Sequence, residues 1–208
     1  MGNNIKVAVI IFHKNVKKYP PLWIQECIFS IQRQTHKEFD VFECDYGAGK
    51  NQIYPDSKFF NKRFKTHAHA HNFLLDEAFK THDVAFNVNI DDYYHPDRFK
   101  KQLRHIKPKG PEHVVSSNYI LVDEYGVEKN RTNFNVLKLR HEMLKGHNII
   151  AHPSVLYSRE FWQKCSRLDP DEIPQDDLKL WQREHRKFRF KILKDYLLYY
   201  RDHKHKIS

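Results

Sequence analysis

Short runs of hydrophobic residues alternate with segments of helical spacing from the start of the chain. Residues 6–12 consist of Lys6 and an unbroken apolar run, which is typical of a strand buried on both faces. Residues 22–31 follow two prolines and repeat apolar side chains at helical intervals, and residues 40–45 again indicate a strand. A strand, a helix and a strand in this order predict a parallel pair joined by a right-handed crossover.

The same alternation continues along the chain. The pattern predicts helices over 72–80 and 95–103 and strands over 83–90 and 114–122. No internal repeat, linker or low-complexity segment separates these elements. We therefore expect one α/β domain over residues 1–208, with a Rossmann-like, mostly parallel central sheet flanked by helices.

The chain is strongly basic, with 36 Lys and Arg against 26 Asp and Glu and a formal net charge of +10. Such a charge favours an anionic partner, such as a nucleic acid, a lipid head group or a phosphorylated small molecule. The basic residues are scattered among acidic ones and form no aromatic–basic RNA-binding motif, so nucleic-acid binding is only a secondary hypothesis. No apolar run approaches the roughly 18 residues of a membrane span. We expect no integral membrane segment, while contact with an anionic membrane surface stays open.

The cysteines and the amino-terminal sequence bear on location. Cys27, Cys44 and Cys165 are an odd number without a C-x-x-C pair, so we expect neither a disulfide framework nor a thiolate zinc site. Residues 1–12 lack the cationic stretch, apolar region and cleavage site of a signal peptide. These features predict a reducing, cytoplasmic environment.

Acidic side chains follow two of the predicted strands. Asp45 ends the strand at 40–45, and the sequence Asn-Ile-Asp-Asp at 89–92 ends the strand at 83–90. Ligands of open α/β sheets bind beyond the carboxyl ends of the strands, so the two sites would open on one edge and form a pocket for a cation and a nucleotide. Alternatively, Asp and Asn stand there because they favour the turns that end strands.

Short motifs follow one another along nearly the whole chain. They are VAVIIFHKN at 7–15, SIQRQT at 30–35, FDVFECDYG at 39–47, AHN at 70–72, NIDDYYHPD at 89–97, HPSV at 152–155, DDLKLW at 176–181 and YRDH at 200–203. In this order they resemble motifs of the family 2 glycosyltransferases, which have the GT-A fold. The corresponding family motifs are V-S-V-I-I-P-T-Y-N, S-I-L-x-Q-T, F-E-I-I-V-V-D-D-G, A-R-N, D-A-D-D-x-x-H-P-D, H-P-S-V, E-D-x-x-L-W and Y-R-x-H. The chain is therefore similar to this family along most of its length.

The resemblance implies a metal-dependent, inverting transferase that moves a hexose from a nucleoside diphosphate sugar to a hydroxyl of a glycan, a protein or a lipid-linked acceptor. Residues from about 1 to 105 would bind the donor, and residues from about 106 to 208 would hold the acceptor and the catalytic base. The implied donor-binding residues are Phe12, His13, Asn15, Asp45, His71, Asn72, Asn89, Asp91 and Asp92. Asp91 would bind Mn²⁺ or Mg²⁺, with His203 as a further contact, since these ions need few protein ligands. Asp45 would receive an N–H of the base, which favours uracil or thymine and so a UDP sugar.

Inverting transfer needs a base that takes the proton of the attacking hydroxyl. Aligning the L-W motif places Asp177 at the base position, whereas aligning the preceding Q-D pair would make Asp176 the base. We favour Asp177. Alternatively, both acids stand there because negative charge is favourable at the amino end of a helix. His152 and Trp181 would lie on the acceptor side.

Several positions depart from the family pattern. F-H-K at 12–14 replaces P-T-Y, His71 replaces the arginine of A-R-N, and Asn89 replaces the first aspartate. These departures motivate an alternative of another class, a transferase-like domain that binds a sugar or a partner without turnover. His71 also ends an alternating stretch, His-Ala-His-Ala-His at 67–71, which would place three imidazoles on one strand face or His67 and His71 on one helix face.

Overall fold

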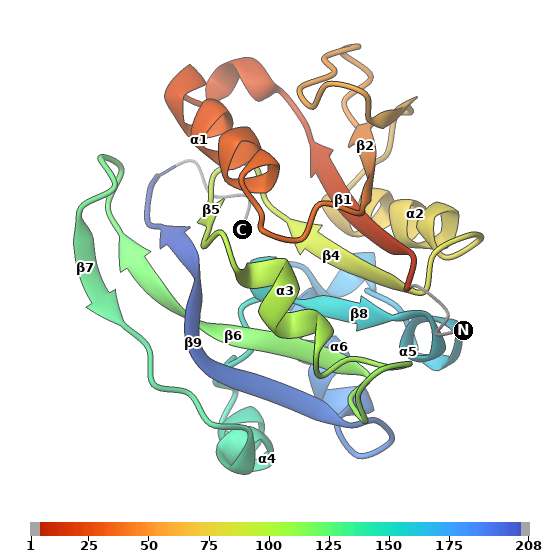
Figure 1. Ribbon diagram of the computed structural model, residues 1–208, viewed down its shortest axis with the longest axis vertical. Coiled ribbons are helices and arrows are strands. Elements are labelled where there is room, and N and C mark those ends of the chain that lie inside the picture. The colour runs from red at the N-terminus through yellow and green to blue at the C-terminus, as the bar shows by residue number, and fades with distance from the viewer. Residues whose placement is uncertain (1–4, 205–208) are drawn as a thin grey trace.

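A curled sheet of nine strands runs through the described part of the chain, residues 5–204 of a computed structural model (Figure 1). The strands are β1 (Val7–His13), β2 (Asp40–Asp45), β3 (Lys58–Asn61), β4 (Val84–Val88), β5 (Tyr93–Tyr94), β6 (Val114–Val122), β7 (Glu128–Arg131), β8 (Leu156–Ser158) and β9 (Phe190–Arg201). The α-helices are α1 (Pro21–Gln32), α2 (His67–Ala78), α3 (Arg98–Leu103), α4 (Leu139–Leu144), α5 (Arg159–Lys164) and α6 (Asp176–Glu184). Short 3-10 helices are η1 (Val16–Lys18), η2 (Val136–Lys138), η3 (His152–Ser154) and η4 (Pro170–Glu172).

The sheet contains two groups of parallel strands, to which β5, β7 and β8 add antiparallel pairings. The strands follow the order β3-β2-β1-β4-β8-β6-β9-β5, and β7 pairs with β6. β1 pairs in parallel with β2 and β4, and β3 pairs in parallel with β2, while β6 and β9 form a second parallel pair. β8 joins the two groups by running antiparallel to both β4 and β6. The carboxyl ends of β1, β2 and β4 therefore meet at one edge, where open α/β sheets bind ligands.

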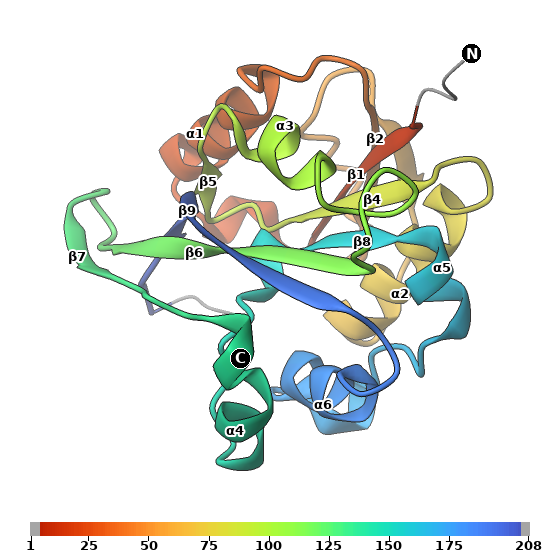
Figure 2. The same ribbon diagram turned by 60° about the horizontal axis from the view of Figure 1, so that its bottom comes forward.

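Helices cover both faces of the sheet (Figures 1 and 2). Val9 of β1 belongs to the core shared with α1 and α3, and its neighbour Ile10 belongs to the core shared with α2, α4, α5 and α6. Because side chains alternate across a strand, burial on both faces explains the unbroken apolar run of β1. The expected α/β architecture is confirmed.

The start of α2 differs from its prediction. The helix begins at His67, five residues before the predicted start at 72, because the Thr66 hydroxyl accepts a hydrogen bond from the His69 N–H at 3.5 Å and caps it. The His-Ala alternation is therefore helical, and His67 and His71 lie four residues apart on one face.

The S-I-Q-R-Q-T segment has a structural role at the end of α1. Gln34 is fully buried, and its side-chain amide donates to the carbonyls of Ser30 and His95 at 3.0 and 2.9 Å. Its amide oxygen accepts from the Phe99 N–H at 3.0 Å. These bonds satisfy buried polar groups and join α1 to the segment between β5 and α3.

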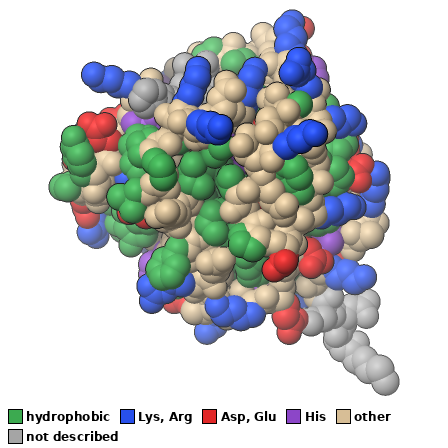
Figure 3. Space-filling view, turned by 90° about the horizontal axis from the view of Figure 1, so that it is seen from above, with side chains coloured by type: hydrophobic (Ala, Val, Ile, Leu, Met, Phe, Trp, Pro, Cys, Tyr) green, Lys and Arg blue, Asp and Glu red, His purple; other side chains and the backbone are tan. Residues whose placement is uncertain are grey.

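Positive charge is distributed over the surface. Figure 3 shows Lys and Arg side chains scattered over the face seen from above, with hydrophobic side chains between them.

Leu22 and Phe29 of α1 are 61 % and 56 % exposed, and Phe29 lines a shallow groove together with Ile24, Ile28 and Ile53. Among residues 5–204, no helix has both the length and the apolar character needed to cross a membrane.

Candidate active site

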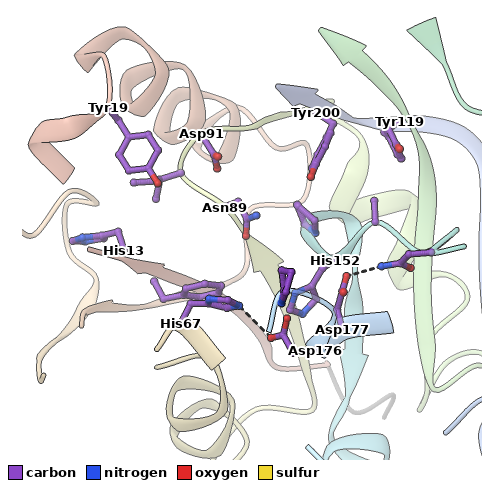
Figure 4. Close-up of a pocket in the computed structure, with 16 residues that line it drawn as sticks. His13, Tyr19, His67, Asn89, Asp91, Tyr119, His152, Asp176, Asp177 and Tyr200 are labelled. Carbon is purple, nitrogen blue, oxygen red and sulfur yellow. Dashed lines mark hydrogen bonds and ion pairs between the residues drawn. The ribbon is translucent and has the colours of Figure 1, made fainter. Parts of the chain in front are cut away.

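A cavity of about 330 Å³ opens at the carboxyl ends of β1 and β4 (Figure 4). The expected site residues that line it are Phe12, His13, Asn89, Asp91, His152, Asp176 and Asp177. The other lining residues are Tyr19, His67, Ile90, Tyr119, Asn148, Ala151, Pro153, Pro174 and Tyr200. Figure 4 shows Asp91 at one end, Asp176 and Asp177 at the other, and Asn89 between them. The cavity thus brings two acidic groups from distant parts of the sequence to one space.

The remaining expected residues lie around the cavity without lining it. They are Asn15, Asp45, His71, Asn72, Asp92, Trp181 and His203. Trp181 is fully buried behind His152, with 6.0 Å between the ring centroids. The side chain of Asn72 bonds to the backbone of Leu168, and Asn15 is an exposed residue with φ 54° at the start of η1. Of these three residues, Trp181 supports the wall of the cavity through its contact with His152.

Arg201, from the Y-R-D-H motif, holds the turn that contains Asp91 and Asp92. Its side chain is 1 % exposed. The Arg201 backbone N–H donates to Asp92 Oδ1 at 2.8 Å, Nε donates to the Asp91 carbonyl at 3.0 Å, and Nη2 donates to Glu26 Oε2 at 2.6 Å. A buried guanidinium requires such partners, because an unpaired buried charge is costly. Arg201 therefore fixes the backbone from which the Asp91 side chain enters the cavity.

Asp91 and His203 form a pair that suits a divalent cation. Asp91 Oδ2 lies 2.8 Å from His203 Nε2. This separation is close to the distance of about 3 Å between two neighbouring ligands of an octahedral ion, each of which lies about 2.1 Å from the ion. Asn89 Oδ1, in the same turn, is buried and has no hydrogen-bond partner among the described residues. Within residues 5–204, no group of three or more His, Cys, Asp or Glu side chains could hold a metal. The pair fits an ion that takes its other ligands from a diphosphate and water.

Asp176 and Asp177 begin α6, and each has a partner of its own. Asp176 is 4 % exposed, and its Oδ2 lies 3.1 Å from His67 Nε2. Asp177 Oδ2 accepts from Asn148 Nδ2 at 2.8 Å, and its Oδ1 accepts from the Leu178 N–H at 2.7 Å. Both side-chain contacts are drawn in Figure 4. One carboxylate is thus paired with an imidazole and the other with a neutral amide.

The two carboxyl groups also differ in protonation. Burial raises the pKa of Asp177 to about 6, and the neighbouring Asp176 carboxylate adds to the rise. Burial opposes the ionisation of Asp176 too, but the hydrogen bond from His67 and the nearby His152 outweigh it, so the pKa of Asp176 lies below its usual 3.8. A carboxylate that titrates near pH 6 is the better general base close to neutral pH.

His71 does not reach the cavity. It is fully buried on α2, and its ring packs against the rings of Phe12, His152 and Trp162 at centroid distances of 5.6, 4.7 and 5.7 Å. Burial lowers the pKa of His71 well below 6.5, so its ring is neutral. The expected contact of His71 with a diphosphate is therefore not available in this structure, and His67, one turn earlier on α2, lines the cavity instead.

Asp45 ends β2 as predicted, but its carboxylate is engaged by the loop that follows. Its Oδ1 accepts from the Gly47 N–H at 3.0 Å, and its Oδ2 accepts from the backbone and side chain of Asn51 at 3.1 and 3.0 Å. Although burial opposes ionisation, the bonds from Asn51 lower the pKa of Asp45 below 3.8. A Cβ at Gly49 would lie 2.9 Å from Asp45 Oδ2. Asp45 shapes this loop, and its contact with a nucleobase stays a prediction.

Glu43 is a buried acid of β2 that the motifs do not single out. It is fully buried, and Oε1 accepts from the Ile53 N–H at 2.7 Å and lies 3.0 Å from His13 Nε2. Its Oε2 accepts from the Tyr54 N–H at 3.0 Å and from the Ser57 hydroxyl at 2.9 Å. The carboxylate therefore fixes both His13, in the cavity wall, and the loop between β2 and β3.

We expect Glu43→Ala to lower the free energy of unfolding by about 2–4 kcal/mol, because it leaves several buried donors without an acceptor. Urea unfolding measures this change, and limited proteolysis should locate new cleavage between residues 51 and 57. Glu128→Ala is the control, since Glu128 forms an exposed pair with Arg131, and exposed ion pairs contribute little to stability. Equal unfolding midpoints for the two variants would contradict the assignment of Glu43 as the anchor of this loop.

Five polar lining residues are absent from the site expected from the sequence: Tyr19, His67, Tyr119, Asn148 and Tyr200. Tyr200 stands in the Y-R-D-H motif and His67 in the His-Ala stretch, so both carried a signal. Tyr119 is an inner position of a predicted strand, whereas Tyr19 and Asn148 lie in segments without a motif. The fold alone brings these last two residues to the cavity.

Comparisons with known proteins show the fold. No protein-family model and no curated protein matches the sequence. S. aureus TarS 1–349 in complex with UDP-GlcNAc aligns with 97 % of this chain at a TM-score of 0.72 and 17 % identity, and the same protein with UDP aligns with 95 % at 0.69 and 18 %. The mannosyltransferase PcManGT from Pyrobaculum calidifontis, in complex with GDP-Man and Mn²⁺, aligns with 92 % at 0.62 and 17 %. The chain spans 60 % and 61 % of the two TarS chains and 55 % of PcManGT. The fold is GT-A-like.

Proposed function

We propose that this protein is a glycosyltransferase of family 2 type, which transfers a hexose from a nucleoside diphosphate sugar to an acceptor hydroxyl with inversion. The observation that carries the proposal is the cavity itself, because it places Asp91, which pairs with His203 behind the cavity wall, and the Asp176–Asp177 pair at opposite ends of one space on a GT-A-like fold. Similar structures hold UDP, UDP-GlcNAc or GDP-Man. We favour a UDP sugar because of the resemblance at Asp45.

Asp177 is the general base of this proposal. Its carboxylate takes the proton of the acceptor hydroxyl while the hydroxyl oxygen bonds to the anomeric carbon and the bond from that carbon to the phosphate oxygen breaks. The electron pair of the broken bond leaves with the nucleoside diphosphate. Attack from the face opposite the leaving group inverts the configuration. Asn148 orients the Asp177 carboxylate through its 2.8 Å hydrogen bond.

The donor side is formed by residues of the first half of the chain, and the acceptor and base side by residues of the second half. Asp91 and His203 would hold Mn²⁺ or Mg²⁺, with Asn89 as a further polar group of the same turn. When bound, the ion stabilises the negative charge that develops on the leaving diphosphate. Arg201 keeps the Asp91 turn in place, and His152 would face the acceptor.

A donor screen tests the proposal. UDP-GlcNAc, UDP-glucose, dTDP-glucose and GDP-mannose are each incubated with the protein and Mn²⁺, with and without simple glycosides, and the release of nucleoside diphosphate is measured. Release from one nucleotide class is expected. Donor binding without release would favour the non-catalytic domain, an alternative that the burial of His71 supports. Salt-sensitive oligonucleotide binding without donor affinity would favour the nucleic-acid hypothesis.

The pH dependence of transfer follows from Asp177. Only the ionised carboxylate can accept a proton, and its pKa is about 6. We expect kcat/KM to rise about tenfold per pH unit below pH 6 and to level off above it. Initial rates between pH 4.5 and 8.5 measure the profile. An acid limb centred near pH 4 would contradict the assignment of Asp177 as the base.

A further inference from the structure

His67 lines the cavity, but the proposed chemistry gives it no role. His67 begins α2 and faces the amino end of α6 across the cavity wall, where its Nε2 lies 3.1 Å from Asp176 Oδ2 (Figure 4). The side chains of His67 and Asp176 are 15 % and 6 % exposed. This contact joins two elements that are 109 residues apart in sequence.

We propose that His67 is a positioning residue, which holds Asp176 as a fixed anion and so leaves Asp177 as the carboxylate that exchanges the proton. This inference rests on the proposed function. Two adjacent carboxyl groups in a buried site compete for one proton, because both ionised forms together are unfavourable. The hydrogen bond from the His67 imidazole to Asp176 removes that competition. The neutral amide of Asn148 changes the proton affinity of Asp177 much less.

The surroundings of the pair support this division of roles. Tyr157 of β8 lies near both carboxylates, and His152 of η3 lies near Asp176. Tyr200 of β9 interacts more strongly with Asp92 and Asp91 than with Asp177, and His71 lies behind His67. Burial lowers the pKa of His152 to about 4 and raises that of Tyr157, so both are neutral near pH 7. His71 is neutral for the same reason. His67 is therefore the imidazole whose contact with Asp176 decides where the proton resides.

Carbon-13 NMR of labelled aspartate carboxyl groups tests the proposal without any substrate. In the native protein, Asp177 is expected to titrate near pH 6 while Asp176 stays ionised above pH 4. In His67→Ala, both carboxyl groups should titrate, and the midpoint at which the pair loses its proton should rise by about one pH unit. His67→Gln keeps a hydrogen-bond donor at this position and should lie between the two. His69→Ala, an exposed neighbour on the same helix, is the matched control and should leave both titrations unchanged.

Donor turnover supplies the second readout. A rise of one unit in the midpoint lowers the rate of His67→Ala about fivefold at pH 6 and leaves it nearly unchanged at pH 8, with the donor KM unaffected. A uniform loss at all pH values, or an NMR titration of Asp177 that does not move in either His67 variant, overturns the proposal. If the NMR midpoint rises but no donor is turned over by the native protein, the pairing stands and the proposed function fails.

Discussion

Asp177→Asn is expected to lower the rate of transfer at least 100-fold while the affinity for the nucleotide sugar changes less than about threefold. Asparagine has the shape of aspartate and can keep a contact with Asn148, but it has no charge and cannot accept the proton of the acceptor hydroxyl. The donor is expected at the other end of the cavity, near Asp91. Initial rates and calorimetric titration of the donor measure the two effects.

The same substitution should make the folded protein more stable. The pKa of Asp177 is raised from 3.8 to about 6 in the folded state, so folding disfavours its ionised form. This cost is absent below about pH 4 and complete above pH 6. Asp177→Asn is neutral at every pH, so we expect its free energy of unfolding to exceed that of the native protein by about 1–3 kcal/mol at pH 7, and to equal it near pH 4.

The control for Asp177→Asn is Asp195→Asn, an exposed position that pairs with Lys101 outside the cavity. It should leave both the rate of transfer and the free energy of unfolding nearly unchanged. A variant at position 177 that retains native turnover would remove Asp177 as the base and return the choice to Asp176. A variant that loses both turnover and donor affinity would point to a binding role for Asp177.

Asp91→Asn is expected to abolish the effect of Mn²⁺ on nucleotide binding. The carboxylate and His203 Nε2 form the pair that suits the ion, and the amide of asparagine is a much poorer ligand for a divalent cation. We expect the dissociation constant of UDP in Mn²⁺ to rise at least about tenfold, while the constant measured in EDTA stays the same. Titration calorimetry in both buffers gives the comparison.

Asp56→Asn is the matched control for Asp91→Asn, because Asp56 is an exposed loop residue outside the cavity. An unchanged Mn²⁺ effect in Asp91→Asn would place the cation elsewhere. Equal losses in Mn²⁺ and in EDTA would instead show that the substitution disturbs the turn held by Arg201.

Several strands of the fold could be predicted because they have strong local patterns. β1 is a continuous apolar run buried on both faces, and β2 and β6 have the predicted bounds, 40–45 and 114–122. β9 lies outside the predicted elements, because its tyrosines, lysines and leucines do not alternate regularly. Its pairing with β6 contains register shifts at Ser117 and Asn118. Such a strand is specified by its neighbours in the sheet rather than by its own sequence.

The candidate site could be predicted where a motif ends a strand or begins a helix. Asp91, Asp176 and Asp177 are such positions, and all three line the cavity. His71 shows the limit of this reasoning, because a motif gives the position of a residue but not the direction of its side chain. On α2 that direction is toward Phe12 and Trp162, in the core. His67 is on the same helical face, but one turn nearer to α6 and the cavity.

Glu43 shows the converse. A glutamate inside an apolar strand has no local signal for burial, since charged residues are rarely fully buried unless they are paired. Its partners come from the loop at 53–57 and from His13 on the neighbouring strand, and no pattern in the sequence links these segments. Long-range hydrogen bonds of this kind become visible only in the folded structure.

Calorimetric titration of UDP, dTDP and GDP, each with and without Mn²⁺, tests most directly the claim that the cavity is a metal-dependent nucleotide-sugar site. We expect UDP to bind with a dissociation constant at least about tenfold lower in Mn²⁺ than in EDTA, and GDP to bind more weakly. Binding of none of the three nucleotides under either condition would contradict the claim.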